Sequence, residues 1–86
     1  MKIKDIFEIE VIDGKQFMVC LDSTVLAGMI ELNETAAFIV NCLFEETTVD
    51  QIADKLVSEY DVEKEAAIEG AEQIINQLRQ LGVIEE

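Results

Sequence analysis

The chain contains no histidine, no proline and no tryptophan, and only two of its 86 residues are cysteines. Without histidine, the sequence lacks the commonest general acid or base and the usual nitrogen ligand of a zinc site. Cys20 and Cys42 lie far apart among apolar neighbours, so they form neither a C-x-x-C redox motif nor a disulfide framework. We expect two buried, reduced thiols, no catalytic site, no metal and no other cofactor.

Basic residues are scarce as well, because six lysines and arginines oppose nineteen acids and give a net charge of −13 at pH 7. A nucleic-acid binder must neutralise phosphates with basic side chains, and an anionic membrane surface attracts the same groups. Both partners are therefore disfavoured. No apolar run is long enough for a membrane span or a secretory signal, which predicts a cytoplasmic protein.

The acids are unevenly distributed. Residues 45–86 contain twelve acids and only three bases. Such an excess is typical of a solvated face that keeps a protein soluble. The sharper alternative is electrostatic steering toward a basic partner.

The composition indicates one domain over residues 1–86, since half of the residues are hydrophobic and no linker, repeat or low-complexity segment divides the chain. Residues 6–21 alternate apolar and acidic side chains around Asp13 and Gly14, which is typical of a β-hairpin. A third strand is expected over residues 25–32, with Gly28 marking a bulge or a close approach by another backbone.

The register of the hairpin depends on the length of its loop. A two-residue Asp13-Gly14 loop would set Glu10 opposite Phe17. A three-residue loop over 12–14 would instead pair Ile9 with Phe17 and gather the glutamates on the opposite face. We therefore predict the three-residue loop.

Helical periodicity begins after residue 32. Asn33 is a suitable N-cap for a first helix that ends at residues 45–47. Thr48 with Gln51 has the spacing of a capping box and starts a second helix, which Tyr60 closes. Asp61 is expected to cap a third helix that runs to about Leu81, after which Gly82 stops it and residues 83–84 fold back on the core.

Three strands followed by three helices predict an α+β fold, and the short turn between the last two helices makes it a winged helix-turn-helix. The expected core comprises Phe7, Ile9, Val11, Phe17, Val19, Ile39, Leu43, Ile52, Leu56, Ile75 and Leu78.

Two other functions are compatible with parts of this pattern. A winged helix-turn-helix regulator would need a basic recognition helix, whereas the third helix is rich in glutamate. An acyl-carrier-type domain would be modified on Ser23, in the segment Asp22-Ser23-Thr24, but it needs a long helix upstream, where this chain has the hairpin.

Several segments together resemble a known family. They are Leu32-Asn33-Glu34-Thr35-Ala36-Ala37-Phe38-Ile39, Thr48-Val49-Asp50-Gln51-Ile52-Ala53 with Leu56, Glu59-Tyr60-Asp61-Val62, and Leu78-Arg79-Gln80-Leu81-Gly82-Val83-Ile84. The pair formed by the first two is similar to the pyrroloquinoline quinone biosynthesis protein D (PqqD) family. One departure is Val40, which stands where many members have tryptophan.

The resemblance implies a non-catalytic peptide chaperone that holds the leader of a ribosomally made precursor peptide. Such a chaperone presents the peptide to a modifying enzyme, often a radical SAM protein. A monomer is expected rather than a dimer.

The predicted peptide site combines the edge of the third strand with small side chains on the third helix. An unpaired strand edge can accept an extended peptide by β-strand addition, although it can also be an ordinary edge guarded by Glu31. Gly70 in the middle of a helix permits either a ligand groove or close packing of helices. The predicted peptide-binding residues are Leu26, Met29, Ile30, Glu31, Ala66, Gly70, Gln73, Ile74 and Gln77.

Overall fold

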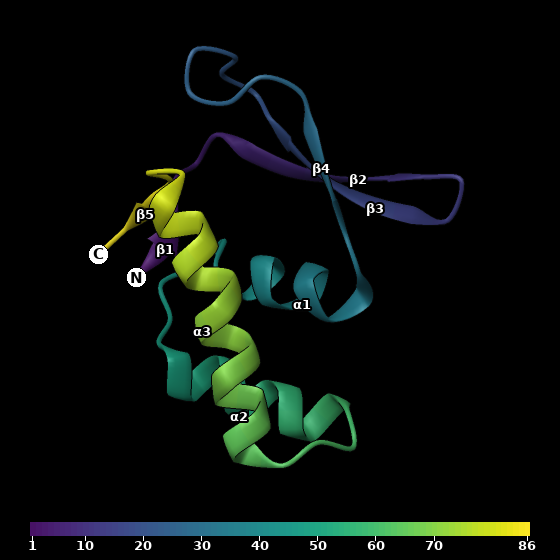
Figure 1. Ribbon diagram of the computed structural model, residues 1–86, viewed down its shortest axis with the longest axis vertical. Helices are drawn as coiled ribbons and strands as arrows, with labels where there is room; N and C mark the ends of the chain where they lie inside the picture. Colours follow the sequence, from purple (N-terminus) through teal and green to yellow (C-terminus); the bar gives the residue numbers. More distant parts are fainter.

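The computed structural model describes residues 1–86 and consists of a three-stranded antiparallel sheet followed by three helices (Figure 1). The strands β2 (Phe7–Ile12), β3 (Lys15–Cys20) and β4 (Met29–Leu32) lie in the order β2-β3-β4. The helices are α1 (Glu34–Cys42), α2 (Val49–Glu59) and α3 (Lys64–Gln80). The predicted α+β class is confirmed.

A second, two-stranded sheet pairs β1 (Lys2–Ile3) with β5 (Ile84–Glu85), in antiparallel register. The sequence did not predict this pair, because two residues are too few to show an alternating pattern. Residues 83–84 do fold back on the core as expected, since Val83 is fully buried.

The hairpin turn consists of Asp13 and Gly14 alone, because Ile12 pairs directly with Lys15. Both turn residues have positive φ, 53° and 76°, as a type I′ turn requires. This turn has the same twist as the strands that it joins, and it fixes the register. The prediction of a three-residue loop is therefore wrong: Ile9 pairs with Met18, and Glu10 pairs with Phe17.

This register gives the sheet two different faces. The inner face contacts α1 and contains Phe7 and Met18, which are both buried. The outer face contains Phe17 and Val19, which are only half-buried. Side chains alternate between the two faces of a sheet, and the observed register differs from the predicted one by one residue. Phe17 and Val19, which were predicted to point inward, therefore lie on the outer face, and Met18 lies in the core.

The core is formed by the inner face of the sheet and the facing sides of the three helices. Seven predicted core residues are buried: Phe7, Ile39, Leu43, Ile52, Leu56, Ile75 and Leu78. Ile9, Phe17 and Val19 are half-buried. The prediction for Val11 is wrong, since this side chain is 66% exposed near the tip of the hairpin, beyond the helices.

The first two helices begin at their predicted caps. The side-chain oxygen of Asn33 accepts a hydrogen bond of 2.8 Å from the backbone nitrogen of Ala36. The hydroxyl of Thr48 accepts one of 3.2 Å from the backbone nitrogen of Gln51. These side chains satisfy backbone N–H groups that have no partner within a helix.

The third helix differs at its start. Its N-cap is Glu63 rather than Asp61, and no side chain caps it. The backbone nitrogen of Val62 donates to the carbonyl oxygen of Tyr60 at 2.9 Å, which places Asp61 in a tight turn before the helix. In the first turn of α3, Lys64 forms an ion pair of 2.7 Å with Asp54 on α2 and so ties the two helices together.

The third strand is shorter than predicted, because residues 25–28 belong to the loop between β3 and β4. The carboxylate of Asp22 accepts hydrogen bonds from the backbone nitrogen and the hydroxyl of Thr24 at the start of this loop. These bonds lower the pKa of the Asp22 carboxyl. Gly28, with a φ of 88°, closes the loop before β4.

No helix combines the length and the apolar character that crossing a membrane requires. No helix precedes residue 34 either, so the acyl-carrier alternative lacks the helix that it needs upstream of Ser23.

Candidate functional site

One side of β4 has no strand partner. β4 is the last strand of its sheet and pairs only with β3. The main-chain hydrogen bonds that lie outside helices and strands involve no residue of β4. The structure therefore leaves a row of backbone donors and acceptors open at this edge.

The register identifies the open groups. In an antiparallel ladder, successive residues direct their N–H and C=O groups to alternate sides of the strand. Ile12 and Lys15, which flank the two-residue turn, form a hydrogen-bonded pair, so the main-chain groups of every second residue of β3 from Lys15 onward face β2. The residues between them bond to Ile30 and Leu32 of β4. The main-chain groups of Met29 and Glu31 therefore face outward. Only two residues of β4 are available for strand addition.

The side chains of β4 divide between the two faces of the sheet. Met29, which is 54% exposed, and Glu31 lie on the outer face. Ile30 is half-buried and packs against the core. Leu26 also packs against the core, but it lies in the preceding loop, so its predicted position on the strand is wrong.

The predicted residues of α3 share one flank of that helix. Ala66, Gly70, Gln73, Ile74 and Gln77 lie roughly a third of a turn away from the buried stripe of the helix. Ile74 is half-buried, whereas Gln73 and Gln77 are exposed. A β-carbon built on Gly70 would meet no atom within 4 Å, so this glycine does not serve close packing between helices.

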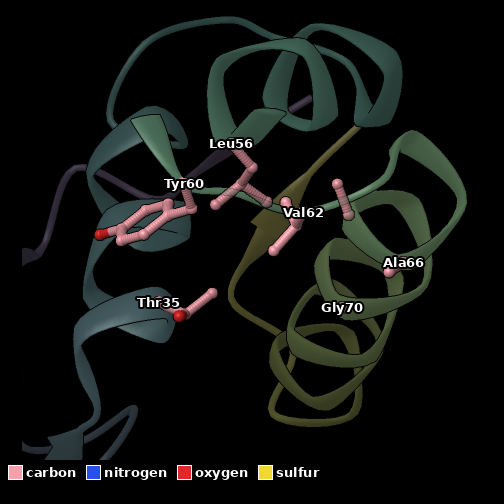
Figure 2. A pocket seen from close by; sticks show the side chains of 7 residues that line it. Thr35, Leu56, Tyr60, Val62, Ala66 and Gly70 are labelled. Carbon is pink, nitrogen blue, oxygen red and sulfur yellow. The ribbon is translucent and has the colours of Figure 1, made fainter. Parts of the chain in front are cut away.

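Ala66 and Gly70 line an apolar pocket of about 130 Å³ between the start of α1, the end of α2 and the start of α3 (Figure 2). The complete lining is Thr35, Leu56, Tyr60, Val62, Ala66, Ala67 and Gly70. In the close-up, Tyr60 and Thr35 lie on the α1 side of the pocket and Gly70 lies on the side of α3. Small side chains on α3 thus leave room that larger ones would fill.

Sequence reasoning missed the part of this pocket that lies outside α3. Tyr60 is the only tyrosine in the chain and occupies the C-cap of α2. Its ring packs edge-on against Phe38 of α1, with the centroids 5.6 Å apart. In the sequence, the only signal for this part of the pocket is an isolated aromatic residue at the end of a helix. That Tyr60 lines a pocket becomes visible only when α1 packs against α2.

The surroundings of Tyr60 oppose ionisation of its hydroxyl. Desolvation raises the pKa of this phenol, and the carboxylates of Glu34 and Glu59 raise it further. Tyr60 therefore contributes a neutral, apolar ring with one polar end to the pocket.

One residue that lines the pocket, Thr35, follows the last residue of β4, Leu32, after only two intervening residues. The start of α1 thus connects the two parts of the predicted site, β4 and the flank of α3 that contains Gly70. No residue of β4 lines either of the two pockets found in the structure, so β4 and α3 do not enclose a common groove.

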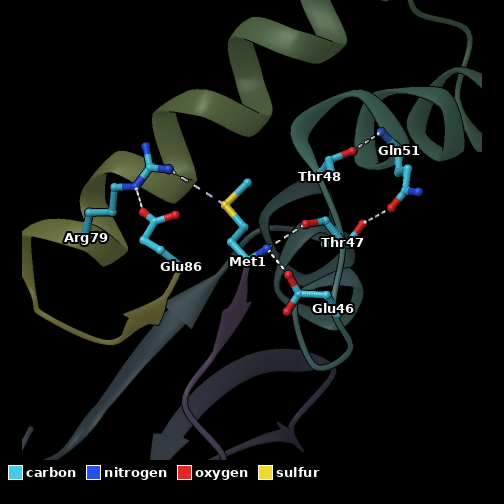
Figure 3. Close-up of polar contacts among 7 residues, drawn as sticks. All are labelled: Met1, Glu46, Thr47, Thr48, Gln51, Arg79 and Glu86. Carbon is cyan, nitrogen blue, oxygen red and sulfur yellow. Dashed lines mark hydrogen bonds and ion pairs between the residues drawn. The ribbon is translucent and has the colours of Figure 1, made fainter.

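The two ends of the chain are held against each other, apart from β4 (Figures 1 and 3). The amino group of Met1 forms an ion pair with Glu46 and donates a hydrogen bond of 2.9 Å to the carbonyl oxygen of Thr47. Arg79 pairs with Glu86 at 2.8 Å. Because β5 is held here by β1, the C-terminal residues do not cover the open edge of β4.

The second pocket is polar and lies between the loop after α1 and the start of α2. It is lined by Cys42, Glu45, Glu46, Thr47, Gln51, Asp54 and Lys55. No group of three or more histidine, cysteine or acidic side chains is arranged to hold a metal ion. Burial raises the pKa of the Cys42 thiol, and a raised pKa opposes a role as nucleophile.

Two solved structures have a similar fold. TbiB1 in complex with the TbiA(beta) leader peptide aligns with a TM-score of 0.77 and 21% identity, over 99% of this chain and 95% of that chain. A lasso peptide synthetase B1 complexed with the leader peptide aligns with a TM-score of 0.75 and 24% identity, over 99% of this chain and 96% of that chain. At these identities the likeness establishes the fold.

No curated protein matches the chain. The family model for coenzyme PQQ synthesis protein D (PqqD) matches residues 18–84, from within β3 to the first residue of β5. This match confirms the resemblance that the helical segments indicated, and it extends to β4, on whose open edge the predicted site depends. The chain therefore belongs to the PqqD family.

Proposed function

We propose that this chain binds the leader of a ribosomally synthesised precursor peptide by strand addition to β4 and presents the peptide to a modifying enzyme. The observation that carries the proposal is the open edge of β4, with the main-chain groups of Met29 and Glu31 unpaired. Membership of the PqqD family supports it. Two proteins of the same fold, each solved with a leader peptide, support it further.

The main chain of the peptide supplies the first part of the interaction. An extended peptide alongside β4 would become the fourth strand of the sheet and bond to Met29 and Glu31. These contacts require an extended backbone and no particular side chain. They provide affinity without selecting one sequence.

Selectivity then depends on the side chains of the peptide. Every second side chain of the added strand points toward the inner face of the sheet, where α1 lies. We assign the apolar pocket beside Gly70, which adjoins the start of α1 just after β4, to one apolar side chain of the leader, and Gln73 and Gln77 on the same flank of α3 offer amide groups. The leader thus needs an extended segment with an apolar residue at one position.

The chain itself supplies no catalytic group in this proposal. It has no histidine to act as a base, and its two cysteines are free, half-buried thiols. Chemistry on the precursor belongs to the partner enzyme, a radical SAM protein or a similar modifying enzyme. The chain acts in the cytoplasm as a monomer, because a second copy paired through β4 would occupy the edge that the peptide needs.

The decisive experiment is a scan of N-methylated leader peptides. Sequencing of the genes that flank the gene for this chain identifies the precursor, and the probe is its synthetic leader with one backbone N–H methylated at a time. Strand addition predicts that affinity falls at every second position within the bound segment, since alternate N–H groups face β4. Binding that is absent, or losses without this alternation, would overturn the proposal.

A pair of variants tests the pocket. We expect Gly70→Leu to weaken leader binding by about tenfold or more, because a large side chain fills the pocket. Gly70→Ala is the matched control and should bind almost normally. Calorimetric titration measures both affinities, and circular dichroism checks that each variant is folded. Unchanged affinity of Gly70→Leu would remove this pocket from the site.

A further inference from the structure

The outer face of the sheet carries an apolar centre between rows of carboxylates. The register places Glu8, Val19 and Met29 in one row across the three strands, and Glu10, Phe17 and Glu31 in the next. Phe17 is thus flanked by a glutamate on each neighbouring strand. Ile12, which is 44% exposed, continues the apolar surface toward the turn.

No helix covers this face. Among the helices, only α1 makes substantial contact with the sheet, and it lies on the inner face, against Met18. All three helices lie on one side of the sheet in the ribbon view (Figure 1). Apolar side chains arranged among charges, without an internal partner, are typical of an interaction surface.

The charges indicate the chemistry of the partner. The face combines three glutamates with one lysine, Lys15 at the turn. An arginine whose guanidinium stacks on the ring of Phe17 could pair with Glu10 or Glu31 at the same time. A second copy of this chain would instead bring glutamates against glutamates, which disfavours self-association through this face.

We propose that this outer face docks the enzyme that modifies the bound peptide, through a basic surface with an apolar contact at its centre. The inference rests on the proposed function. Met29 links the two surfaces, because its main chain lies at the open edge while its side chain lies on the outer face. An added peptide strand would extend this face by one strand, so an enzyme seated on Phe17 lies directly beside the peptide.

Photocrosslinking identifies the partner. A photoreactive phenylalanine analogue replaces Phe17 in the cells that produce this chain, and the same analogue at Val57, an exposed apolar position on α2, is the control. We expect an adduct with a precursor-modifying enzyme at position 17 that position 57 does not give. Equal adducts at both positions, no adduct, or an adduct with a second copy of this chain would overturn the proposal.

Affinity measurements with the purified enzyme then test the chemistry. We expect Phe17→Ser and the double variant Glu8→Lys/Glu10→Lys each to weaken binding by about tenfold or more. The double variant Glu69→Lys/Glu72→Lys, at two exposed positions of α3, is the matched charge control and should change binding less than about twofold. Full affinity of both outer-face variants would also overturn the proposal.

The leader peptide distinguishes the two proposals. Phe17→Ser and Glu8→Lys/Glu10→Lys should bind the synthetic leader almost as the unaltered chain does, because these side chains lie on the outer face, whereas the leader bonds to main-chain groups of β4 and occupies the pocket. Loss of enzyme binding with normal leader binding supports the docking face. Failure of the unaltered chain to bind the leader contradicts the proposed function, whatever the enzyme does.

Discussion

Gly70 shows how one missing side chain can leave space for a ligand. It lies within α3, where glycine is unfavourable because its backbone loses more freedom on folding than that of alanine. A β-carbon at this position would meet no neighbouring atom, so the fold does not require the glycine. Gly70 therefore weakens the helix without a packing reason within the fold.

We therefore expect Gly70→Ala to raise the free energy of unfolding by about 1 kcal/mol. The physical reason is the smaller entropy of the unfolded chain at alanine, with no new clash in the folded state. Urea denaturation followed by circular dichroism measures the change. A destabilised variant would show that the space beside Gly70 is smaller than the structure indicates.

Cys42 illustrates how burial changes chemistry at a single residue. Desolvation raises the pKa of its thiol, and the positive charge of Lys55 lowers it only in part. At a given pH the native chain thus holds less thiolate at this position than an unfolded chain does. Thiolate is the reactive form in alkylation.

Alkylation of Cys42 by iodoacetamide should accordingly be slower in the native chain than in urea at slightly alkaline pH. The midpoint of its rate against pH should also lie above that of the unfolded chain, because the native pKa is raised. Peptide mapping by mass spectrometry separates Cys42 from Cys20. A native rate equal to or above the unfolded rate would contradict the predicted direction.

The β2–β3 hairpin is the element whose geometry decides where the proposed binding surfaces lie. Its two-residue turn sets which side chains of β3 face α1 and, through β3, which main-chain groups of β4 remain open. A loop one residue longer would bring Phe17 and Val19 inward and move Met18 outward. The turn therefore controls the core, the open edge and the outer face together.

Replacing Gly14 by valine should destabilise the protein by about 1–2 kcal/mol, because a side chain branched at the β-carbon strains the left-handed backbone at a φ of 76°. Asp13→Asn, which keeps a residue that tolerates positive φ, is the control and should be nearly neutral. Chemical denaturation compares the two variants. Equal stability of Gly14→Val and the unaltered chain would contradict the turn type.

At the scale of the whole molecule, the negative charge is the dominant property. The net charge of −13 surrounds the proposed binding site, which combines an apolar pocket with the backbone edge of β4. Such a field attracts a basic peptide or a basic enzyme surface over a distance of about one Debye length, roughly 10 Å at 0.1 M salt. Charge thus affects the rate of encounter more than the contacts at the site.

We expect the association rate of a leader peptide with net positive charge to fall by about tenfold or more between low and high sodium chloride. The dissociation rate should change much less, since main-chain hydrogen bonds and apolar contacts hold the complex. Stopped-flow fluorescence measures both rates. A salt-independent association rate would leave solubility as the only role of the acidic surface.

The sequence predicted the helices well because their signals are local. Asn33 and Thr48 cap the first two helices as expected, and the buried positions Ile39, Ile52 and Ile75 follow from apolar side chains at helical spacing. The strands were predicted less well. Residues 25–28 have strand-like composition yet form a loop, since a strand also needs a partner in register.

The candidate site required information that no segment contains by itself. The sequence indicated Gly70 and the edge strand, but Tyr60 and Thr35 join Gly70 only where α1, α2 and α3 meet. The outer face was missed because the predicted register placed Phe17 and Val19 in the core. These surfaces depend on contacts between residues that are distant in the chain.

By itself, the sequence determined the α+β class, the helix boundaries set by capping side chains, the family and the acidic character, because periodicity, hydrogen bonding to nearby backbone and composition act locally or additively. The tertiary structure alone decided the strand register, the β1–β5 pair, the open groups at Met29 and Glu31 and the pocket around Gly70. Each of these depends on which distant segments pack together, and that choice minimises the free energy of the whole chain rather than of any one segment.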